Sequence, residues 1–68
     1  KKIGSRLRQI REGRGLTQKE VADGAQITEV SLSRYENGER VPKITTFFKI
    51  CNVLWVTMDS VIEYCMKN

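Results

Sequence analysis

The stretch LTQKEVA at residues 16–22, followed by SRYENG at residues 33–38, contains the start of one short helix and the end of another. Thr17 and Glu20 have the spacing of a capping box, in which each side chain accepts a hydrogen bond from the other residue's backbone amide. The asparagine and glycine that close the second stretch are typical of a helix C-terminus, because both tolerate the left-handed conformation. Two short helices are therefore expected in close succession.

The residues around these signals predict one helix over about 18–25 and another over about 29–37, with Thr28 as the cap of the second. Apolar residues at helical spacing give each helix a buried side, made of Val21, Ala22 and Ala25 in the first and Leu32 and Tyr35 in the second. Because only a few residues join the two helices, the sequence predicts a helix-turn-helix over about residues 17–37.

The rest of the chain indicates three further helices and no strands, so we expect an all-α fold of five helices. One helix covers about residues 3–13, one follows Pro42 over about 44–54, and the last begins after Thr57. The side chains predicted to face the core from these helices are Ile3, Leu7 and Ile10, then Ile44, Phe47, Ile50, Cys51 and Leu54, and finally Val61 and Ile62.

The chain is short and carries an excess of positive charge. Its 68 residues allow one domain with one core and little room for a deep substrate cleft. The net charge of +4 lies in residues 1–43, where ten Lys and Arg stand against six Asp and Glu, whereas residues 44–68 hold two of each. This excess fits a phosphate-binding surface, although small soluble domains often carry a few extra charges for solubility alone.

The length of the apolar runs and the identity of the first residue lead to two further expectations. No apolar run approaches the length of a membrane span and no secretory leader opens the sequence, so we expect no membrane association. Because the first residue is Lys1 and not Met, we expect the sequence to be part of a longer protein.

The spacing and identity of the residues quoted above closely resemble the phage-repressor/Cro-like (XRE-type) family of DNA-binding domains, and the resemblance covers nearly the whole chain. It implies a five-helix lambda-repressor-like domain over residues 1–68, whose second motif helix reads the major groove of double-stranded DNA. It further implies a cytoplasmic transcription regulator of bacterial, archaeal or phage origin, with repression from an inverted-repeat operator as the expected mode and a homodimer as the expected assembly.

Two positions depart from the pattern of that family. Gln26, in the turn between the motif helices, and Trp55, at the end of the fourth helix, stand where the family commonly has glycine. A side chain in the left-handed conformation costs about 1–2 kcal/mol, so either the strain is tolerated or the turns are built differently. Gly24 is an alternative place at which the end of the second helix could relax.

Matched to the family's groove-facing positions, the residues implied to contact bases are Thr28, Glu29, Val30, Ser33 and Arg34. Arg34 has the strongest chemistry, since its planar guanidinium can bind guanine O6 and N7 together, but it could instead touch phosphate. Glu29 can accept from a cytosine amino group, or it can stabilise the first turn of its helix and hold the Arg34 guanidinium. Val30 can contact a thymine methyl, or it can be a partly buried packing residue.

The family's phosphate-binding positions correspond here to Gln18, Ser31, Asn37, Arg40 and Lys43. The resemblance implies that Gln18 also braces the reading helix. Arg14 and Lys19 are less clear candidates, because either could serve solubility alone. Arg11 and Glu36 match positions that form an ion pair beneath the reading helix, and we expect them to orient that helix without reading bases; the alternative is two unrelated surface charges.

Other chemistries find little support. The chain has no histidine, which removes the commonest general base and the commonest metal ligand. Its two cysteines, Cys51 and Cys65, are fourteen residues apart and lack a zinc-knuckle spacing, so neither a zinc site nor a disulfide framework is expected. Cys51 is predicted to be a small core residue, and Cys65 to be more exposed with redox sensing as a lesser possibility. Gly13-Arg14-Gly15 is too short for a phosphate-cradling loop. We expect neither an enzyme nor a cofactor.

A second function class stays open beside DNA binding. A repressor-like fold can also serve as a protein-interaction or coactivator module without specific DNA binding, in which case the outer face of the second motif helix would be neutral or apolar. For the homodimer, the uncharged C-terminal part of the chain supplies the candidates, because aromatic and thioether side chains are enriched at interfaces. These candidates are Trp55, Met58, Tyr64 and Met66; the alternative is that they shield the fourth helix.

Overall fold

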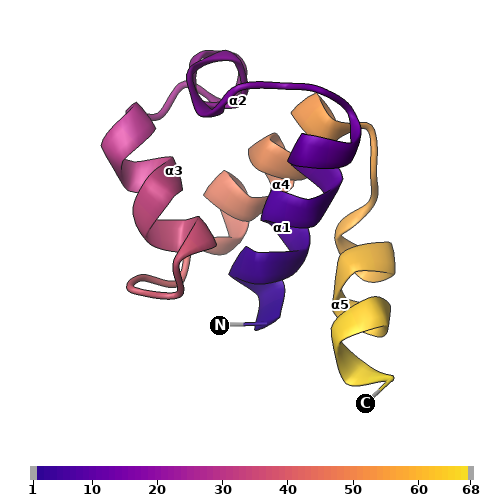
Figure 1. Cartoon of the computed structure of the whole chain (residues 1–68). Helices are drawn as coiled ribbons and strands as arrows, with labels where there is room; N and C mark the ends of the chain where they lie inside the picture. Colours follow the sequence, from indigo (N-terminus) through magenta and orange to yellow (C-terminus); the bar gives the residue numbers. More distant parts are fainter. Residues whose placement is uncertain (1, 68) are drawn as a thin grey trace.

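The computed structural model describes residues 2–67, which form five α-helices (Figure 1). These helices are α1 (Lys2–Gly13), α2 (Gln18–Ala25), α3 (Glu29–Glu36), α4 (Ile44–Leu54) and α5 (Met58–Met66). No strand occurs among these residues, so the predicted all-α class is confirmed. The predicted bounds need only small corrections: α1 begins one residue earlier, and α3 ends at Glu36 with Asn37 as its cap. No helix of residues 2–67 combines the length and apolarity needed to cross a bilayer.

Three of the helices begin at a threonine cap. At α2 the predicted capping box is present: the Glu20 amide donates to Thr17 Oγ1 at 3.1 Å, and the Thr17 amide donates to Glu20 Oε1 at 2.8 Å. Thr28 and Thr57 accept the amides of the residues three positions later, each at 3.0 Å. Each cap satisfies an amide that the first helical turn leaves without a partner. Local sequence therefore determines where α2, α3 and α5 start.

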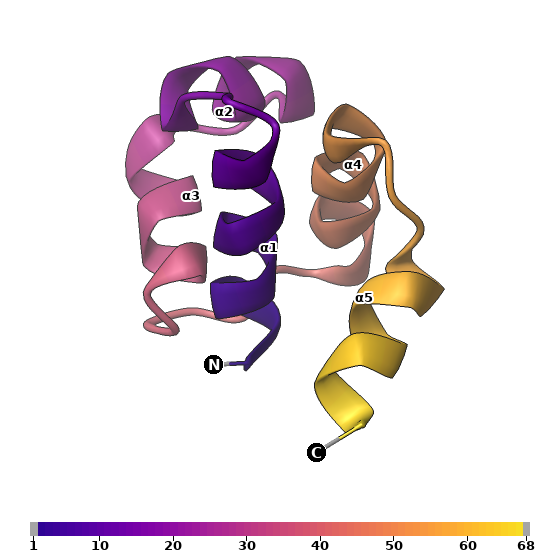
Figure 2. The same cartoon turned by 45° about the vertical axis from the view of Figure 1, so that its right-hand side comes forward.

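The helices surround one core, with α3 and α5 on opposite sides of α1 (Figures 1 and 2). Helix α2 packs against α3 and α4, α3 also packs against α1, and α5 packs against α1 and α4. Apolar side chains from all five helices fill the centre, namely Leu7, Val21, Ala22, Ala25, Leu32, Phe47, Ile50, Cys51, Leu54 and Val61. Burial raises the pKa of the Cys51 thiol to about 11, which keeps the thiol neutral and suits it to this apolar position.

Two residues predicted for the core lie at the surface instead. Ile44, the first residue of α4, is 73% exposed, because it lies with Phe48 and Met58 at a surface hollow and not on the side of α4 that buries Phe47. Ile62 is 38% exposed, because the buried side of α5 is narrow and only Val61 is fully enclosed there. Cys65, expected to be exposed, is partly buried. Helical periodicity identifies the inward face of a helix, but it does not reveal how far neighbouring helices cover that face.

At both positions where the family commonly has glycine, the backbone adopts the strained left-handed conformation. Gln26 and Trp55 cap α2 and α4 in the left-handed conformation, with φ of 60° and 63°. Gly24 does not relax the end of α2: it is helical, and a Cβ there would lie 2.9 Å from Val53 Cγ2 of α4. The absence of a side chain at Gly24 thus lets α2 and α4 approach closely. The left-handed conformation of Gln26 and Trp55 therefore lowers the stability of the fold.

Replacement of Trp55 by glycine is expected to stabilise the domain. The indole is 82% exposed and contributes little packing, while the left-handed backbone costs about 1–2 kcal/mol for a residue with a Cβ. Glycine's greater freedom in the unfolded chain offsets part of this gain, which leaves about 0.5–1 kcal/mol. Urea unfolding followed by far-UV circular dichroism measures the change. Trp55→Ala is the control, since it removes the indole but keeps the strain, and equal stability of both variants would contradict the explanation.

Candidate nucleic-acid interface

Helix α3 presents one face to the core and the other to solvent. Its inner side is held by Leu32 and Glu36, which are buried against α1 and α2. On its outer side lie the residues predicted to contact bases: Thr28, Glu29, Val30 and Arg34 are exposed, and Ser33 is partly exposed. Val30 is 61% exposed, so it is not the packing residue that the sequence left as an alternative. The structure therefore brings all five candidates onto or beside one accessible helix face.

The first turn of α3 is fixed by its own hydroxyl groups. Thr28 Oγ1 accepts the Ser31 amide at 3.0 Å and donates to Ser31 Oγ at 2.9 Å. These bonds hold the exposed Thr28 side chain and the partly buried Ser31 side chain in place. The start of α3 also directs free backbone amides outward, where an anion such as a phosphate is favoured.

Three exposed cations lie in the last turn of α3 and in the loop that leads from it to α4. The chain turns there through Gly38, whose φ is 77°, and the Glu39 and Arg40 amides both donate to the Arg34 carbonyl, at 2.9 and 3.4 Å. This turn keeps the backbone of Arg40 close to that of Arg34, and Lys43 follows just before α4. All three side chains are exposed, and none forms an ion pair within residues 2–67. The contact of Glu29 with the Arg34 guanidinium, which was one alternative role for Glu29, is thus not formed.

The remaining charged candidates separate into two kinds. Lys19 pairs with Asp23 across one helical turn at 3.2 Å, and both side chains are largely exposed. Such an exposed pair contributes little to the stability of the fold. The Asp23 carboxylate also balances the charge of Lys19. Arg14 lies exposed in the loop between α1 and α2, beside Leu16, Val53 and Trp55.

A buried ion pair lies beneath α3. The Arg11 guanidinium of α1 donates twice to Glu36, from Nε to Oε2 at 2.7 Å and from Nη2 to Oε1 at 3.1 Å. A third bond runs from Arg11 Nη1 to the Leu16 carbonyl at 2.8 Å. The side chains are 10% and 1% exposed, so the alternative of two unrelated surface charges is wrong. The hydrogen bonds to Glu36 raise the pKa of Arg11, and the charge persists in spite of burial.

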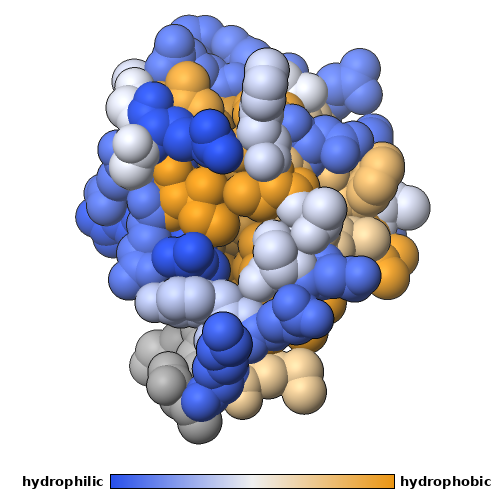
Figure 3. Space-filling view, turned by 90° about the vertical axis from the view of Figure 1, so that its right-hand side faces the viewer, coloured by the Kyte–Doolittle hydropathy of each residue, from blue (hydrophilic) through white to orange (hydrophobic). Residues whose placement is uncertain are grey.

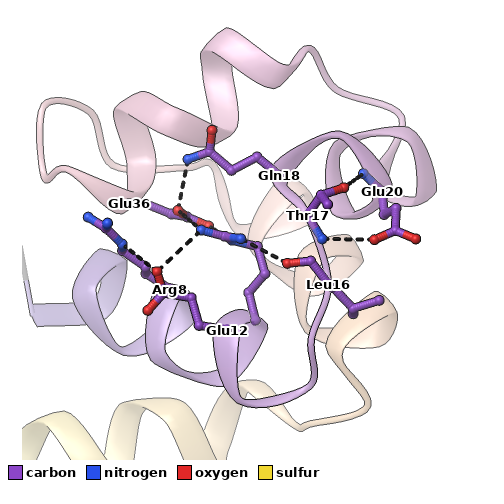
Figure 4. Close-up of polar contacts among 8 residues, drawn as sticks. Arg8, Glu12, Leu16, Thr17, Gln18, Glu20 and Glu36 are labelled. Atoms are coloured by element: carbon purple, nitrogen blue, oxygen red, sulfur yellow. Dashed lines mark hydrogen bonds and ion pairs between the residues drawn. The ribbon is translucent and has the colours of Figure 1, made fainter.

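Gln18 joins this pair from the start of α2. Its Nε2 donates to Glu36 Oε1 at 3.0 Å, so that one carboxylate connects α1, α2 and α3 (Figure 4). In Figure 4, Gln18 reaches Glu36 from above while the capping box of Thr17 and Glu20 holds the start of the same helix. The network explains how a short helix such as α3 keeps a fixed orientation while its outer face contacts solvent only.

The four candidates for the dimer surface do not lie together. Trp55 borders a shallow pocket with Arg14, Leu16 and Val53. Tyr64 of α5 is stacked under the Arg6 guanidinium of α1, 3.7 Å from the ring centroid. This contact was not predicted, because no local pattern pairs residues 58 positions apart. Met58 is partly buried at a separate groove, and Met66 is exposed near the end of α5.

Apolar surface gathers away from α3. Figure 3 shows the side of the molecule opposite α3, where an apolar area is surrounded by hydrophilic side chains. A hollow where α1 meets α5 is lined by Ile10, Val56 and Val61, together with Arg6 and Lys67. A second hollow of about 380 Å³ lies between the starts of α4 and α5. Its lining is Ile44, Thr45, Phe48, Lys49 and Met58. Sequence reasoning missed this groove, since it expected Ile44 to be buried.

Within residues 2–67, no group of three or more His, Cys, Asp or Glu side chains is arranged to hold a metal ion. The two cysteines are free thiols.

Comparison with known proteins gives consistent matches. The model of a family described as helix-turn-helix matches residues 7–61. The chain is 37% identical over 69 residues to the HTH-type transcriptional regulator ImmR of Bacillus subtilis, covering 97% of this chain and 54% of the relative. It is 33% identical over 61 residues to the SPbeta prophage-derived uncharacterized HTH-type transcriptional regulator YonR of the same organism, covering 90% and 56%. The chain thus spans about half the length of these relatives.

Solved structures share the fold. The clp gene regulator ClgR from Corynebacterium glutamicum superposes with a TM-score of 0.90 at 24% identity, over 93% of this chain and 67% of that chain. The restriction-modification controller protein C.Esp1396I superposes with a TM-score of 0.85 at 24% identity, over 97% and 86%. At this level of identity the likeness describes the arrangement of the helices alone.

Proposed function

We propose that this chain, which belongs to the helix-turn-helix family, is the DNA-binding domain of a transcriptional regulator and reads a specific duplex site with α3 in the major groove. The single observation that carries the proposal is the outer face of α3, which is solvent-exposed and carries Arg34, with Arg40 and Lys43 in the loop after it; none of these three cations has an ion-pair partner in residues 2–67. The naming of its relatives as transcriptional regulators supports the same class of function. Repression by occupation of a promoter is the expected mode.

Base reading is assigned to the outer side of α3. Arg34 is the principal contact, since its guanidinium matches guanine O6 and N7 in the major groove. Val30 offers an apolar surface to a thymine methyl, and Glu29 an acceptor to a cytosine amino group. Thr28 and Ser33 are the two remaining residues assigned to base contacts.

Phosphate contacts are assigned to the border of the same face. Arg40 and Lys43 supply the charge, and Ser31 and Asn37 lie near the two ends of α3, where short polar groups suit an anion. Gln18 keeps one amide hydrogen and its carbonyl beyond the bond to Glu36, so bracing α3 leaves it able to contact phosphate. A protein-interaction module would present a neutral or apolar face here, so the exposed cations do not favour that alternative.

Selection of bound sequences from a random duplex pool tests the proposal directly. One enriched motif, bound more tightly than a shuffled duplex of equal length at the same salt concentration, is the expected result. Recovery of unrelated sequences with equal affinity would leave only electrostatic binding and would refute sequence-specific regulation by this domain.

Arg34→Ala is expected to weaken binding to the selected site by about 1–3 kcal/mol and to relax the preference at one base position. The reason is the loss of a bidentate contact that only one base pair offers in the required geometry. Competition binding with duplexes that vary each position in turn measures both effects. A uniform loss across all duplexes would assign Arg34 to the phosphates.

The assembly that we propose is a homodimer on an inverted repeat. One α3 covers only a few base pairs, so a second copy is needed to select a site in a genome. The groove between α4 and α5 is the preferred contact between copies, because Ile44 and Phe48 are 73% and 51% exposed there beside the partly buried Met58. Trp55, Tyr64 and Met66, which lie apart from one another, are retained as competing candidates.

Footprinting on the selected duplex is expected to protect two half-sites whose centres lie about 34 Å apart, with two chains bound per duplex. Phe48→Ser should abolish cooperative filling of the second half-site, whereas Trp55→Ser should leave it intact if the α4–α5 groove is the contact. The reverse result would move the dimer surface to Trp55. Saturation by one chain on a single half-site would exclude the dimer.

A further inference from the structure

Gly4 is the point at which α1 comes closest to the backbone of α3. The residue is buried on the first turns of α1. A Cβ placed there would overlap the Tyr35 carbonyl oxygen, and it would lie 3.0 Å from the Tyr35 carbonyl carbon and 3.2 Å from the Glu36 carbonyl oxygen. These atoms are backbone, so no change of rotamer can make room. Any side chain at position 4 must therefore separate α1 from the last turn of α3.

The same turn of α3 is held in place by the buried ion pair and leads into the loop that contains Arg40. Glu36 is fixed to α1 through Arg11 and to α2 through Gln18. The Tyr35 carbonyl also accepts the Gly38 amide at 3.1 Å, in the turn that leads to Arg40. A displacement at Gly4 would thus act on the orientation of α3 and on the loop behind it at once.

We propose that Gly4 is a positioning residue for base reading, which sets how deeply the end of α3 sits against α1 and hence how its outer face meets the groove. The inference rests on the proposed DNA-binding function. A methyl group at position 4 needs a displacement on the order of 1 Å to restore ordinary contact distances. Hydrogen bonds to base edges tolerate little change, because their strength falls steeply with distance and angle.

Contacts to phosphate respond differently to such a displacement. Arg40 and Lys43 are long, exposed side chains that reach the backbone of any duplex, and they can follow a small shift. A displacement of α3 is therefore expected to lower the affinity for a specific duplex more than the affinity for a non-specific duplex. A residue that only stabilises the fold would lower both in proportion, whereas a positioning residue lowers the specific affinity selectively.

The test compares Gly4→Ala with Gly13→Ala, which adds the same methyl group to the same helix at a position with no atom within 4 Å. Both variants are measured under conditions in which circular dichroism shows them to be folded, on the selected duplex and on a shuffled duplex of equal length. Gly4→Ala is expected to lose about 5- to 150-fold in affinity for the selected duplex, the equivalent of one base contact, with little change on the shuffled duplex. Gly13→Ala should match the unmodified chain on both.

Every other outcome of the affinity measurements contradicts the positioning role of Gly4. Equal loss on both duplexes, or no loss on either, overturns the positioning role. If Gly4→Ala does not fold alone, it is examined together with Trp55→Gly, which lies at the end of α4, away from the contact of α1 with Tyr35. A chain that stays unfolded in that background also overturns the proposal, because Gly4 is then a requirement of the fold itself. Failure of the proposed function is recognised separately, since the unmodified chain would then select no duplex.

Discussion

Glu36→Ala is expected to lower the free energy of unfolding by roughly 3–5 kcal/mol, the largest change anticipated for a single side chain outside the apolar core. The substitution leaves the Arg11 guanidinium buried without its carboxylate and removes the acceptor of the Gln18 amide. A domain of this size seldom has more than about 3–5 kcal/mol to lose, so much of the population should be unfolded at room temperature.

Urea titration followed by far-UV circular dichroism measures this effect. The fluorescence of Trp55 is a poor reporter, because the indole is already 82% exposed in the folded chain. Asp23→Ala is the matched control, since it breaks the exposed pair with Lys19 and should cost less than about 1 kcal/mol. If Glu36→Ala changed stability as little as Asp23→Ala, the ion pair would not be what fixes α3 to α1 and α2.

DNA affinity should fall steeply with salt. If Arg40 and Lys43 each neutralise one phosphate, a dimer neutralises four, which predicts a log–log slope of about −3.6 and a loss of about 150-fold between 50 and 200 mM salt. The cause is the release of counterions from the duplex when lysine and arginine replace them. Fluorescence anisotropy with a labelled duplex over a series of salt concentrations measures the slope.

The slope also assigns the individual cations. Lys43→Ala should reduce its magnitude by about 1.8 for the dimer and weaken binding to every sequence alike. Lys67→Ala is the control, because α5 lies on the side of the molecule opposite α3 and its last residues should be remote from the duplex (Figure 1). A slope near zero, or equal effects of the two substitutions, would remove the phosphate contacts assigned to the border of α3.

The orientation of α3 and the chemistry of its outer face depend on different parts of the molecule. The buried carboxylate of Glu36 connects three helices, whereas Arg34, Arg40 and Lys43 remain exposed. The residues proposed to contact bases contribute little to the core, so their substitution is expected to leave the fold intact. The proposed role of Gly4 rests on the same separation, because Gly4 packs against the backbone of the last turn of α3.

The candidate site was largely predictable because its signals are short. Capping residues determine the start of α3, and the spacing of Leu32 and Tyr35 identifies its inner side, which leaves Val30 and Arg34 outside. The pairing of Arg11 with Glu36 was predicted only through resemblance to a family, since 25 residues separate the two and no local rule joins them. The groove beside Phe48 and the stacking of Arg6 on Tyr64 were not predicted for the same reason.

By itself, the sequence determined the number, kind and limits of the helices, because caps and helical periodicity act through backbone bonds and neighbours within a few residues. Only the tertiary structure decided which apolar faces are covered. Ile44 and Ile62 have core-like spacing but are 73% and 38% exposed, and Gln26 and Trp55 keep left-handed caps that local preference disfavours. Gly4 belongs to the same class, since its importance comes from the backbone of a helix about thirty residues away. Burial, strain and close approach depend on the position of several helices together, and this information is not carried by any short stretch of chain.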